Sequence, residues 1–320
     1  MASRERIPII VLGGHDQRLS EMPAGVEDRH PLAGYKGVAV RIGGRPLIEC
    51  VLERLEQSGS FAPIYIAGPQ SVYAEHRRSA TIIHVSGSID ETVRAGIEGA
   101  GRQNPGVALA VTTCDVLPEI DTLRQLMAQY HAGAPCDGFL PMIRAPEDHA
   151  ALGASAYKPT YFVRPQAGDP PVEVLPCHLA VVDAAAFRMN FIYRYLRLIY
   201  RTRNRPIAYR RRAMLPGIIF ELLFQDLRHL LGLRLPNLTW TVLSSGLPAA
   251  RALKAGTITR AQLENAARRI FITARHRRQY PDRRVLMPLV DGLSLALDID
   301  TQEEAEAMDL NRVRDGFPEI

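Results

Sequence analysis

Residues 7–20, IPIIVLGGHDQRLS, run from an apolar stretch directly into two glycines and a group of polar residues. The apolar residues from Ile7 to Leu12 predict a buried strand, and the glycines predict the turn that closes it. Paired glycines at the carboxyl end of a buried strand allow the backbone to approach a phosphate group closely. The segment is neither of the two common phosphate loops, because it lacks both GxGxxG spacing and a following Gly-Lys-Ser/Thr.

Downstream of the glycine turn, segments with strand-like and helix-like patterns alternate along the chain. Short apolar runs bounded by turn residues predict strands at 63–68, 81–87 and 106–115. Apolar residues at helical spacing predict helices at 47–58 and 89–99, and a further helix begins at Ile120. This alternation is typical of an α/β fold with a doubly wound, mostly parallel sheet.

Ligands of such a sheet bind beyond the carboxyl ends of its strands. Gly13 and Gly14 follow the first predicted strand, and Asp115 ends the longest apolar strand, GVALAVTTCD. We therefore expect these three residues to lie together at one edge of the sheet.

Two further segments are predicted to be strands from their apolar content. One is VAVRI, residues 38–42, and the other is LSLALDID, residues 293–300, which ends in Asp298 and Asp300. The residues that follow, TQEE, have the spacing of a capping box and predict the start of a final helix.

The composition is that of an ordinary core-forming protein, with 320 residues, 47% of them hydrophobic and 23% charged. The four cysteines are widely separated and form no CxxC pair, which argues against a zinc ribbon or a disulfide framework and favours a reducing cytoplasm. No long apolar segment precedes the glycine turn, and no stretch reaches the roughly 18 apolar residues that span a bilayer. The sequence therefore predicts a cytoplasmic protein.

Positive charge is concentrated in residues 187–236, which contain eleven arginines, no lysine and two acidic residues, whereas the net charge of the whole chain is +5. This segment belongs to a predicted helical, arginine-rich insertion at 187–281, in the C-terminal half of an α/β domain formed by 1–186 and 282–320. A packed helical subdomain with solvated arginines is one interpretation. Contact with an anionic membrane surface through 187–236 is a second. Nucleic acid is disfavoured, since no helix-turn-helix or RNA-binding motif accompanies the arginines.

Four motifs, in this order along the chain, resemble the MobA-like NTP transferases, relatives of the sugar-nucleotide cytidylyltransferases. VLGGHDQRL at 11–19 is similar to the opening loop of that family, L-A-G-G-x-S-x-R-M, and the segment from Tyr35 resembles its lysine-containing GkPLle region. TTCDVLP at 112–118 resembles the family's acidic turn, and LDIDTQEE at 297–304 resembles its DVDTPED. The resemblance implies a nucleotide-diphospho-sugar transferase fold, which is Rossmann-like and glycosyltransferase-A-like.

The resemblance also implies which residues bind the nucleotide. Arg18 corresponds to the arginine that contacts the β- and γ-phosphates of an NTP, and Lys36 to a lysine near the α-phosphate, so both are candidate catalytic residues. The other residues implied to bind the NTP are Leu12, Gly13, Gly14 and Ser88, the last of them near the base or ribose.

The metal site implied by the resemblance consists of carboxylates. Asp115 and Asp300, with Asp298 as a neighbour, correspond to ligands of Mg²⁺, with Mn²⁺ as an alternative ion. His178 occupies a place near the acceptor. Simpler interpretations also exist, because an aspartate at a strand end is often a helix cap and His178 is as readily a structural histidine.

The function implied is Mg²⁺-dependent transfer of NMP from an NTP to a phosphorylated or hydroxyl acceptor, with release of pyrophosphate. Two alternatives remain at this point. One is a glycosyltransferase of the same fold that uses a sugar nucleotide, and the other is a non-catalytic nucleotide-binding or membrane-surface adaptor. No motif identifies the base of the NTP, the acceptor or the oligomeric state.

Overall fold

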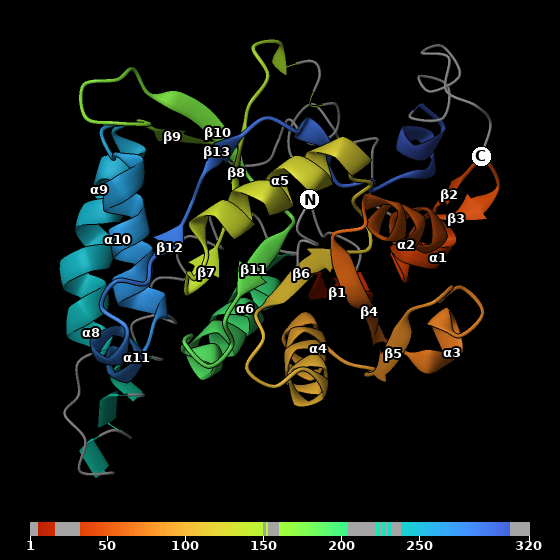
Figure 1. Cartoon of the computed structure of the whole chain (residues 1–320), viewed down its shortest axis with the longest axis horizontal. Helices are drawn as coiled ribbons and strands as arrows, with labels where there is room; N and C mark the ends of the chain where they lie inside the picture. The colour runs from red at the N-terminus through yellow and green to blue at the C-terminus, as the bar shows by residue number, and fades with distance from the viewer. Residues whose placement is uncertain are drawn as a thin grey trace.

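The structure is a computed structural model of the chain (Figure 1), and it describes residues 6–16, 33–149, 152, 160–203 and 238–307, together with 220, 222–224, 226, 227, 230 and 231. Its main sheet has seven strands: β1 (Ile7–Leu12), β4 (Phe61–Gly68), β5 (Thr81–His84), β6 (Leu109–Thr113), β7 (Gly138–Phe139), β11 (Ala180–Val182) and β12 (Val285–Leu286). They are arranged in the order β12-β7-β11-β6-β1-β4-β5.

Strand β1 lies inside this sheet and pairs in parallel with β4 on one side and with β6 on the other. Strand β5 continues the parallel pairing beyond β4, whereas β11 runs antiparallel to both β6 and β7. All six residues of β1 are buried, as expected for a strand of a parallel sheet that is covered on both faces. The predicted fold class, a doubly wound and mostly parallel sheet, is confirmed.

Helices cover both faces of the main sheet. The helices α2 (Leu47–Ser58) and α5 (Ile120–Gly133) lie on one face, and α4 (Ile89–Gln103) and α6 (Met189–Arg203) lie on the other (Figure 1). Because successive side chains of a strand point to opposite faces, Ile9 and Val11 join the core of the first face, and Ile10 and Leu12 join the core of the second.

The ends of two helices agree with the signals in the sequence. Helix α2 ends at Gly59, whose φ of 67° is the left-handed conformation that glycine adopts without strain. Helix α4 begins at Ser88, which forms a capping box with Glu91. Both ends match the bounds predicted from the sequence, the end of the helix at 47–58 and the start of the helix at 89–99.

A second sheet and a group of helices lie at one end of the main sheet (Figure 1). The second sheet has the order β13-β8-β10-β9, with strands β8 (Met142–Arg144), β9 (Tyr161–Val163), β10 (Val172–Pro176) and β13 (Leu289–Val290). The helices are α8 (Leu238–Thr241), the π-helix η2 (Val242–Gly246), α9 (Leu247–Lys254), α10 (Arg260–Phe271) and α11 (Ala274–Gln279). Among the described residues, no helix is long and apolar enough to cross a membrane.

The predicted strand at 38–42 is largely wrong. The chain instead forms one helical turn, α1 (Lys36–Ala39), followed by the short strand β2 (Arg41–Ile42), which pairs with β3 (Arg45–Pro46). Packing explains the difference, since a Cβ atom at Gly37 would lie only 3.1 Å from the Sγ atom of Cys114. The helical turn fits against the end of the main sheet at this close approach.

The predicted strand at 293–300 is also wrong. The segment consists of a 3-10 turn, η3 (Leu293–Leu295), and an unpaired stretch that crosses the edge of the main sheet. Its apolar residues Leu295 and Ile299 are fully buried in the core, which accounts for the strand-like composition. The capping box after it is present, because the N–H of Glu304 donates to Thr301 Oγ1 at 3.2 Å, and the N–H of Thr301 donates to Glu304 Oε2 at 3.1 Å.

The glycine turn packs tightly against α3 (Gln70–Tyr73). The N–H of Gly13 donates to the carbonyl of Ala67 at 2.9 Å, so this residue extends the ladder between β1 and β4. A Cβ atom at Gly13 would lie 2.5 Å from the buried ring of Tyr73, whereas one at Gly14 would lie 3.4 Å from Ile89. Residue 13 must therefore be glycine for the fold itself, and residue 14 need not be.

The variant Gly13→Ala is expected to lower the free energy of unfolding by about 1–3 kcal/mol, because the added methyl group overpacks the contact with Tyr73. Gly14→Ala is the matched control and should change it by less. Urea unfolding monitored by circular dichroism measures both variants. Equal losses in the two variants would contradict this account of the turn.

Candidate functional site

The candidate site lies at the carboxyl ends of β1 and β6, two neighbouring parallel strands. The chain leaves β1 toward β4 and leaves β6 toward β7, on opposite sides, so this edge is a topological switch point, where ligands of such sheets bind. The segment after η3 crosses the same edge, where the N–H of Ile299 donates to the carbonyl of Asp115 at 2.7 Å. Residues from three distant parts of the sequence therefore meet at one place.

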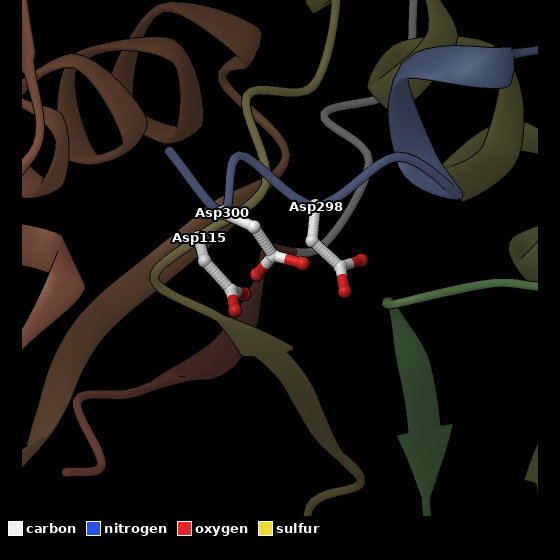
Figure 2. A group of neighbouring side chains, drawn as sticks. All are labelled: Asp115, Asp298 and Asp300. Carbon is white, nitrogen blue, oxygen red and sulfur yellow. The ribbon is translucent and has the colours of Figure 1, made fainter. Parts of the chain in front are cut away.

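Three carboxylates converge at this edge. Asp115 follows β6, and Asp298 and Asp300 come from the crossing segment, with their side chains on the same side of the chain segments that carry them (Figure 2). One carboxylate oxygen of each lies within 4.8 Å of one oxygen of the other two. The structure thus brings together all three residues that were predicted to bind a metal ion.

Lys36, at the start of α1, is almost completely buried beside these carboxylates. Its Nζ atom lies 2.5 Å from Asp300 Oδ1 and 3.3 Å from Asp16 Oδ2. Burial alone would lower the pKa of Lys36, but Asp300, Asp16 and Asp115 outweigh it and hold the pKa above the usual value for lysine. Lys36 therefore carries its positive charge throughout the physiological pH range.

His178 forms the other boundary of the carboxylate cluster. Its Nε2 atom lies 2.7 Å from Asp298 Oδ1, and its Nδ1 atom lies 3.4 Å from the hydroxyl of Thr113 at the end of β6. The backbone N–H of His178 donates to the carbonyl of Leu295 at 2.8 Å, which ties it to the crossing segment. His178 is thus in position to orient Asp298.

The negative charge in this cluster is only partly compensated by protein groups. Burial and the neighbouring Asp298 raise the pKa of Asp115 above the usual value for aspartate, although Lys36 and His178 oppose this rise. Asp115 Oδ1 is buried and has no hydrogen-bond partner. A divalent cation that prefers oxygen ligands would neutralise the excess negative charge and provide a partner for Asp115 Oδ1. The residues present therefore fit a Mg²⁺ or Mn²⁺ site.

The residues predicted to bind the NTP are only partly assembled around this cluster. Leu12 ends β1, and the N–H of Gly13 is used within the sheet, whereas the N–H of Gly14 has no acceptor among the described residues. Ser88 caps α4 beyond the end of β5, and its hydroxyl lies 2.9 Å from Glu91 Oε2. Arg18 lies outside the described residues.

Two residues of the site were not singled out from the sequence. Asp16 pairs with Lys36, and its backbone exchanges two hydrogen bonds of 2.8 Å with Gly34, which brings the two ends of the intervening segment together. Tyr73 packs its ring against the glycine turn, and its hydroxyl is buried without a hydrogen-bond partner. The position of Asp16 between two candidate phosphate-binding residues was the only signal for it, and no local pattern identified Tyr73.

No family model and no curated protein matches the sequence. Among solved structures, a hypothetical transferase from Thermus thermophilus matches with a TM-score of 0.50 at 16% identity, over 94% of this chain and 100% of that one. The 4-diphosphocytidyl-2C-methyl-D-erythritol synthase from Anaerococcus prevotii matches with a TM-score of 0.43 at 9% identity, over 97% and 99%. A CMP:2-keto-3-deoxy-manno-octonic acid synthetase solved with CTP matches with a TM-score of 0.40 at 12% identity, over 64% and 85%. The first of these likenesses shows that the two chains share a fold.

The variant Asp115→Asn is expected to raise the free energy of unfolding by about 1 kcal/mol at neutral pH in a metal chelator. A carboxyl group whose pKa is raised in the folded state destabilises that state above its unfolded pKa, and asparagine removes the charge while keeping the shape. Thermal and urea unfolding in EDTA measure the change. The matched control is Asp291→Asn, a highly exposed aspartate that should have almost no effect.

Proposed function

We propose that this chain is a Mg²⁺-dependent nucleotidyltransferase of the MobA-like kind. It would transfer NMP from an NTP to a phosphorylated or hydroxyl acceptor and release pyrophosphate. The observation that carries the proposal is the cluster of Asp115, Asp298 and Asp300 at a topological switch point, with the buried Lys36 against it.

Asp115, Asp298 and Asp300 are the residues that would hold the metal ion. When bound, the ion supplies positive charge that neutralises the phosphate oxygens on which negative charge accumulates during transfer. Lys36 already neutralises part of the cluster, so the site tolerates three carboxylates in the absence of the ion. His178 keeps Asp298 in place through its Nε2 contact.

The reaction itself requires no covalent intermediate on the protein. An oxygen of the acceptor forms a bond to the α-phosphorus, and the bond from that phosphorus to the oxygen bridging the β-phosphorus breaks. Pyrophosphate leaves with the electron pair of that bond, and a hydroxyl acceptor also releases its proton to solvent. Catalysis of this kind depends on positioning the phosphates and compensating their charge.

The residues around the glycine turn are suited to this task. The N–H of Gly14 is available to a phosphate oxygen, and Lys36 lies between this turn and the carboxylates through its contacts to Asp16 and Asp300. Arg18 follows the same turn in sequence and supplies a fork of donors for the terminal phosphates. The substrate of a glycosyltransferase, a sugar nucleotide, has no γ-phosphate. Such an enzyme therefore does not need the positive charges of Arg18 and Lys36 as a pair.

Pyrophosphate release is the direct test of the proposed function. Purified protein is incubated with each of the four ribonucleoside triphosphates, Mg²⁺ and a panel of sugar phosphates and alcohols, and pyrophosphate is measured by a coupled assay. We expect acceptor-dependent release with at least one NTP, and its loss by about 10²-fold or more in Asp300→Asn, because metal binding and charge compensation both fail. Asp121→Asn, an exposed aspartate on α5, is the control.

Two results would contradict the proposal. Release of a nucleoside diphosphate from a sugar nucleotide would show a glycosyltransferase. Tight NTP binding without turnover for any acceptor in the panel, together with unchanged binding in Asp300→Asn, would show a non-catalytic nucleotide-binding protein.

Arg18→Ala is expected to weaken binding of an NTP far more than binding of the corresponding NMP, because the proposed partners of Arg18 are the terminal phosphates. A charged hydrogen bond of this kind contributes on the order of 1.5–3 kcal/mol. Isothermal titration calorimetry with both nucleotides measures the difference. A loss of equal size for NTP and NMP would assign Arg18 a structural role instead.

A further inference from the structure

The described residues between 220 and 231 expose a stripe of large apolar side chains. Six of them recur at spacings of three, four and seven residues, with adjacent pairs at 223/224 and 230/231, and this spacing places them on one face of a helix: Phe220, Leu223, Phe224, Leu227, Leu230 and Leu231, hereafter the apolar stripe. Leu231 is 78% exposed and Phe220 is 67% exposed, values that are unusual for leucine and phenylalanine in a folded chain. Leu222 and Asp226, on the opposite face, are buried.

The buried face of this segment attaches it to the helices at the end of the molecule. Leu222 packs with Phe191 and Leu238, and the Asp226 carboxylate accepts hydrogen bonds from the backbone N–H groups of Leu238 and Thr239 at 3.0 and 2.8 Å. In Figure 1 the described pieces of the segment, in teal, project beyond α11 and away from the main sheet. The orientation of the stripe toward solvent is thus fixed by contacts on its other side.

Trp240, the only tryptophan of the chain, lies on α8 directly after the capped residues and is 74% exposed. It borders a pocket of about 490 Å³ between α8, η2, α10 and α11. Three arginines line this pocket, namely Arg268, Arg269 and Arg277, and none of its lining residues is acidic. An exposed aromatic ring beside a basic pocket is typical of a surface that meets both apolar and anionic groups.

The positive charge around this pocket exceeds what the neighbouring acids compensate. Arg268 contacts Asp137 at 3.3 Å, but Arg269 has no ion-pair partner among the described residues. Burial lowers the pKa of Arg277, and Arg268, Arg269 and Arg278 lower it further. Burial, together with the nearby Arg277, lowers the pKa of Arg188 to about 10, and its Nη2 atom is buried without a hydrogen-bond partner.

Within the pocket, the π-helix η2 presents a further unused polar group. Ser245 lines the pocket, and its hydroxyl is buried without a hydrogen-bond partner. Three arginine side chains in a lining without carboxylates fit the oxygen atoms of a phosphate ester. The pocket and the apolar stripe are joined through α8, so a single partner can reach both.

We propose that the apolar stripe, Trp240 and the arginine pocket form one docking face for an anionic phospholipid bilayer. The stripe and Trp240 enter the boundary between headgroups and acyl chains, and the pocket receives the phosphate of a headgroup. This proposal does not depend on the proposed nucleotidyl transfer, because none of its residues belongs to the carboxylate site.

Charge decides between a bilayer and a second copy of this chain as the occupant of the stripe. Residues 187–236 carry eleven arginines, no lysine and two acidic residues. A symmetric dimer through the stripe would bring two such segments together, and their like charges would oppose it. An anionic bilayer instead gains from each arginine near its surface, by about fivefold in affinity per residue.

The natural fluorescence of Trp240 is the readout of the test, because no other tryptophan contributes to it. The full-length protein is titrated with vesicles of pure phosphatidylcholine and with vesicles that contain about one third phosphatidylglycerol. We expect a blue shift, quenching by brominated acyl chains and co-sedimentation with the anionic vesicles only. High salt should release the protein, since the Debye length falls from about 10 Å at 0.1 M to about 3 Å at 1 M.

Matched variants separate the two parts of the docking face. Leu230→Ser with Leu231→Ser should weaken vesicle binding by about tenfold or more, because two apolar side chains no longer enter the interface. Arg269→Gln should weaken it by about fivefold and reduce its salt dependence. The controls are Val107→Ser and Arg102→Gln, exposed residues at the far end of α4 and beyond it, which should leave binding unchanged.

Three outcomes would overturn the proposal. The first is the absence of binding to anionic vesicles at low salt. The second is a blue shift that grows with protein concentration without vesicles and coincides with a dimer mass, which would make a second copy the occupant. The third is release from vesicles by millimolar inorganic phosphate with no effect of the Leu230/Leu231 variant, which would leave a pocket for soluble phosphates only.

Discussion

The contact between Lys36 and Asp300 is the constraint on which the site depends. It joins residues separated by 264 positions, and both side chains are buried. A buried ion pair is maintained only if its geometry and surroundings offset the cost of removing two charges from water. The segment 296–300 must therefore cross the end of the main sheet, and the chain before β2 must form a helical turn that directs Lys36 inward.

The same constraint sets the electrostatic character of the site. Lys36 neutralises one carboxylate, but Asp16, Asp115 and Asp298 also face this small volume. Of these carboxylates, His178 pairs with Asp298. Stability alone would not favour this excess of negative charge, because burying an apolar side chain at position 115 costs less free energy than burying a carboxylate. Its presence is explained if a cation and the phosphates that accompany it complete the site.

Local patterns were sufficient for the four parallel strands β1, β4, β5 and β6 of the main sheet and for the convergence of the metal-binding candidates. Apolar runs located β1, β4 and β6, and the rule that ligands bind at the carboxyl ends of parallel strands brought Asp115 to the site. Residues 38–42 and 293–300 were assigned wrongly, because their apolar side chains fill a core around the ion pair instead of extending a sheet. Gly13 shows a related limit, since a pattern suited to phosphate binding also satisfies the packing of Tyr73 against the backbone.

The two concentrations of charge lie on different parts of the fold and have opposite signs. Three carboxylates gather at the carboxyl edge of β1 and β6. Arg268, Arg269 and Arg277 instead lie on α10 and α11, helices that stand beyond β12 (Figure 1). An anionic surface attracts the second region and repels the first, so the field of the molecule orients its approach before any contact forms. In that orientation the carboxylate edge, where we propose the metal ion, would be held away from the anionic headgroups. The proposed NTP site would then stay open to solution while the arginine-rich end stays at the surface.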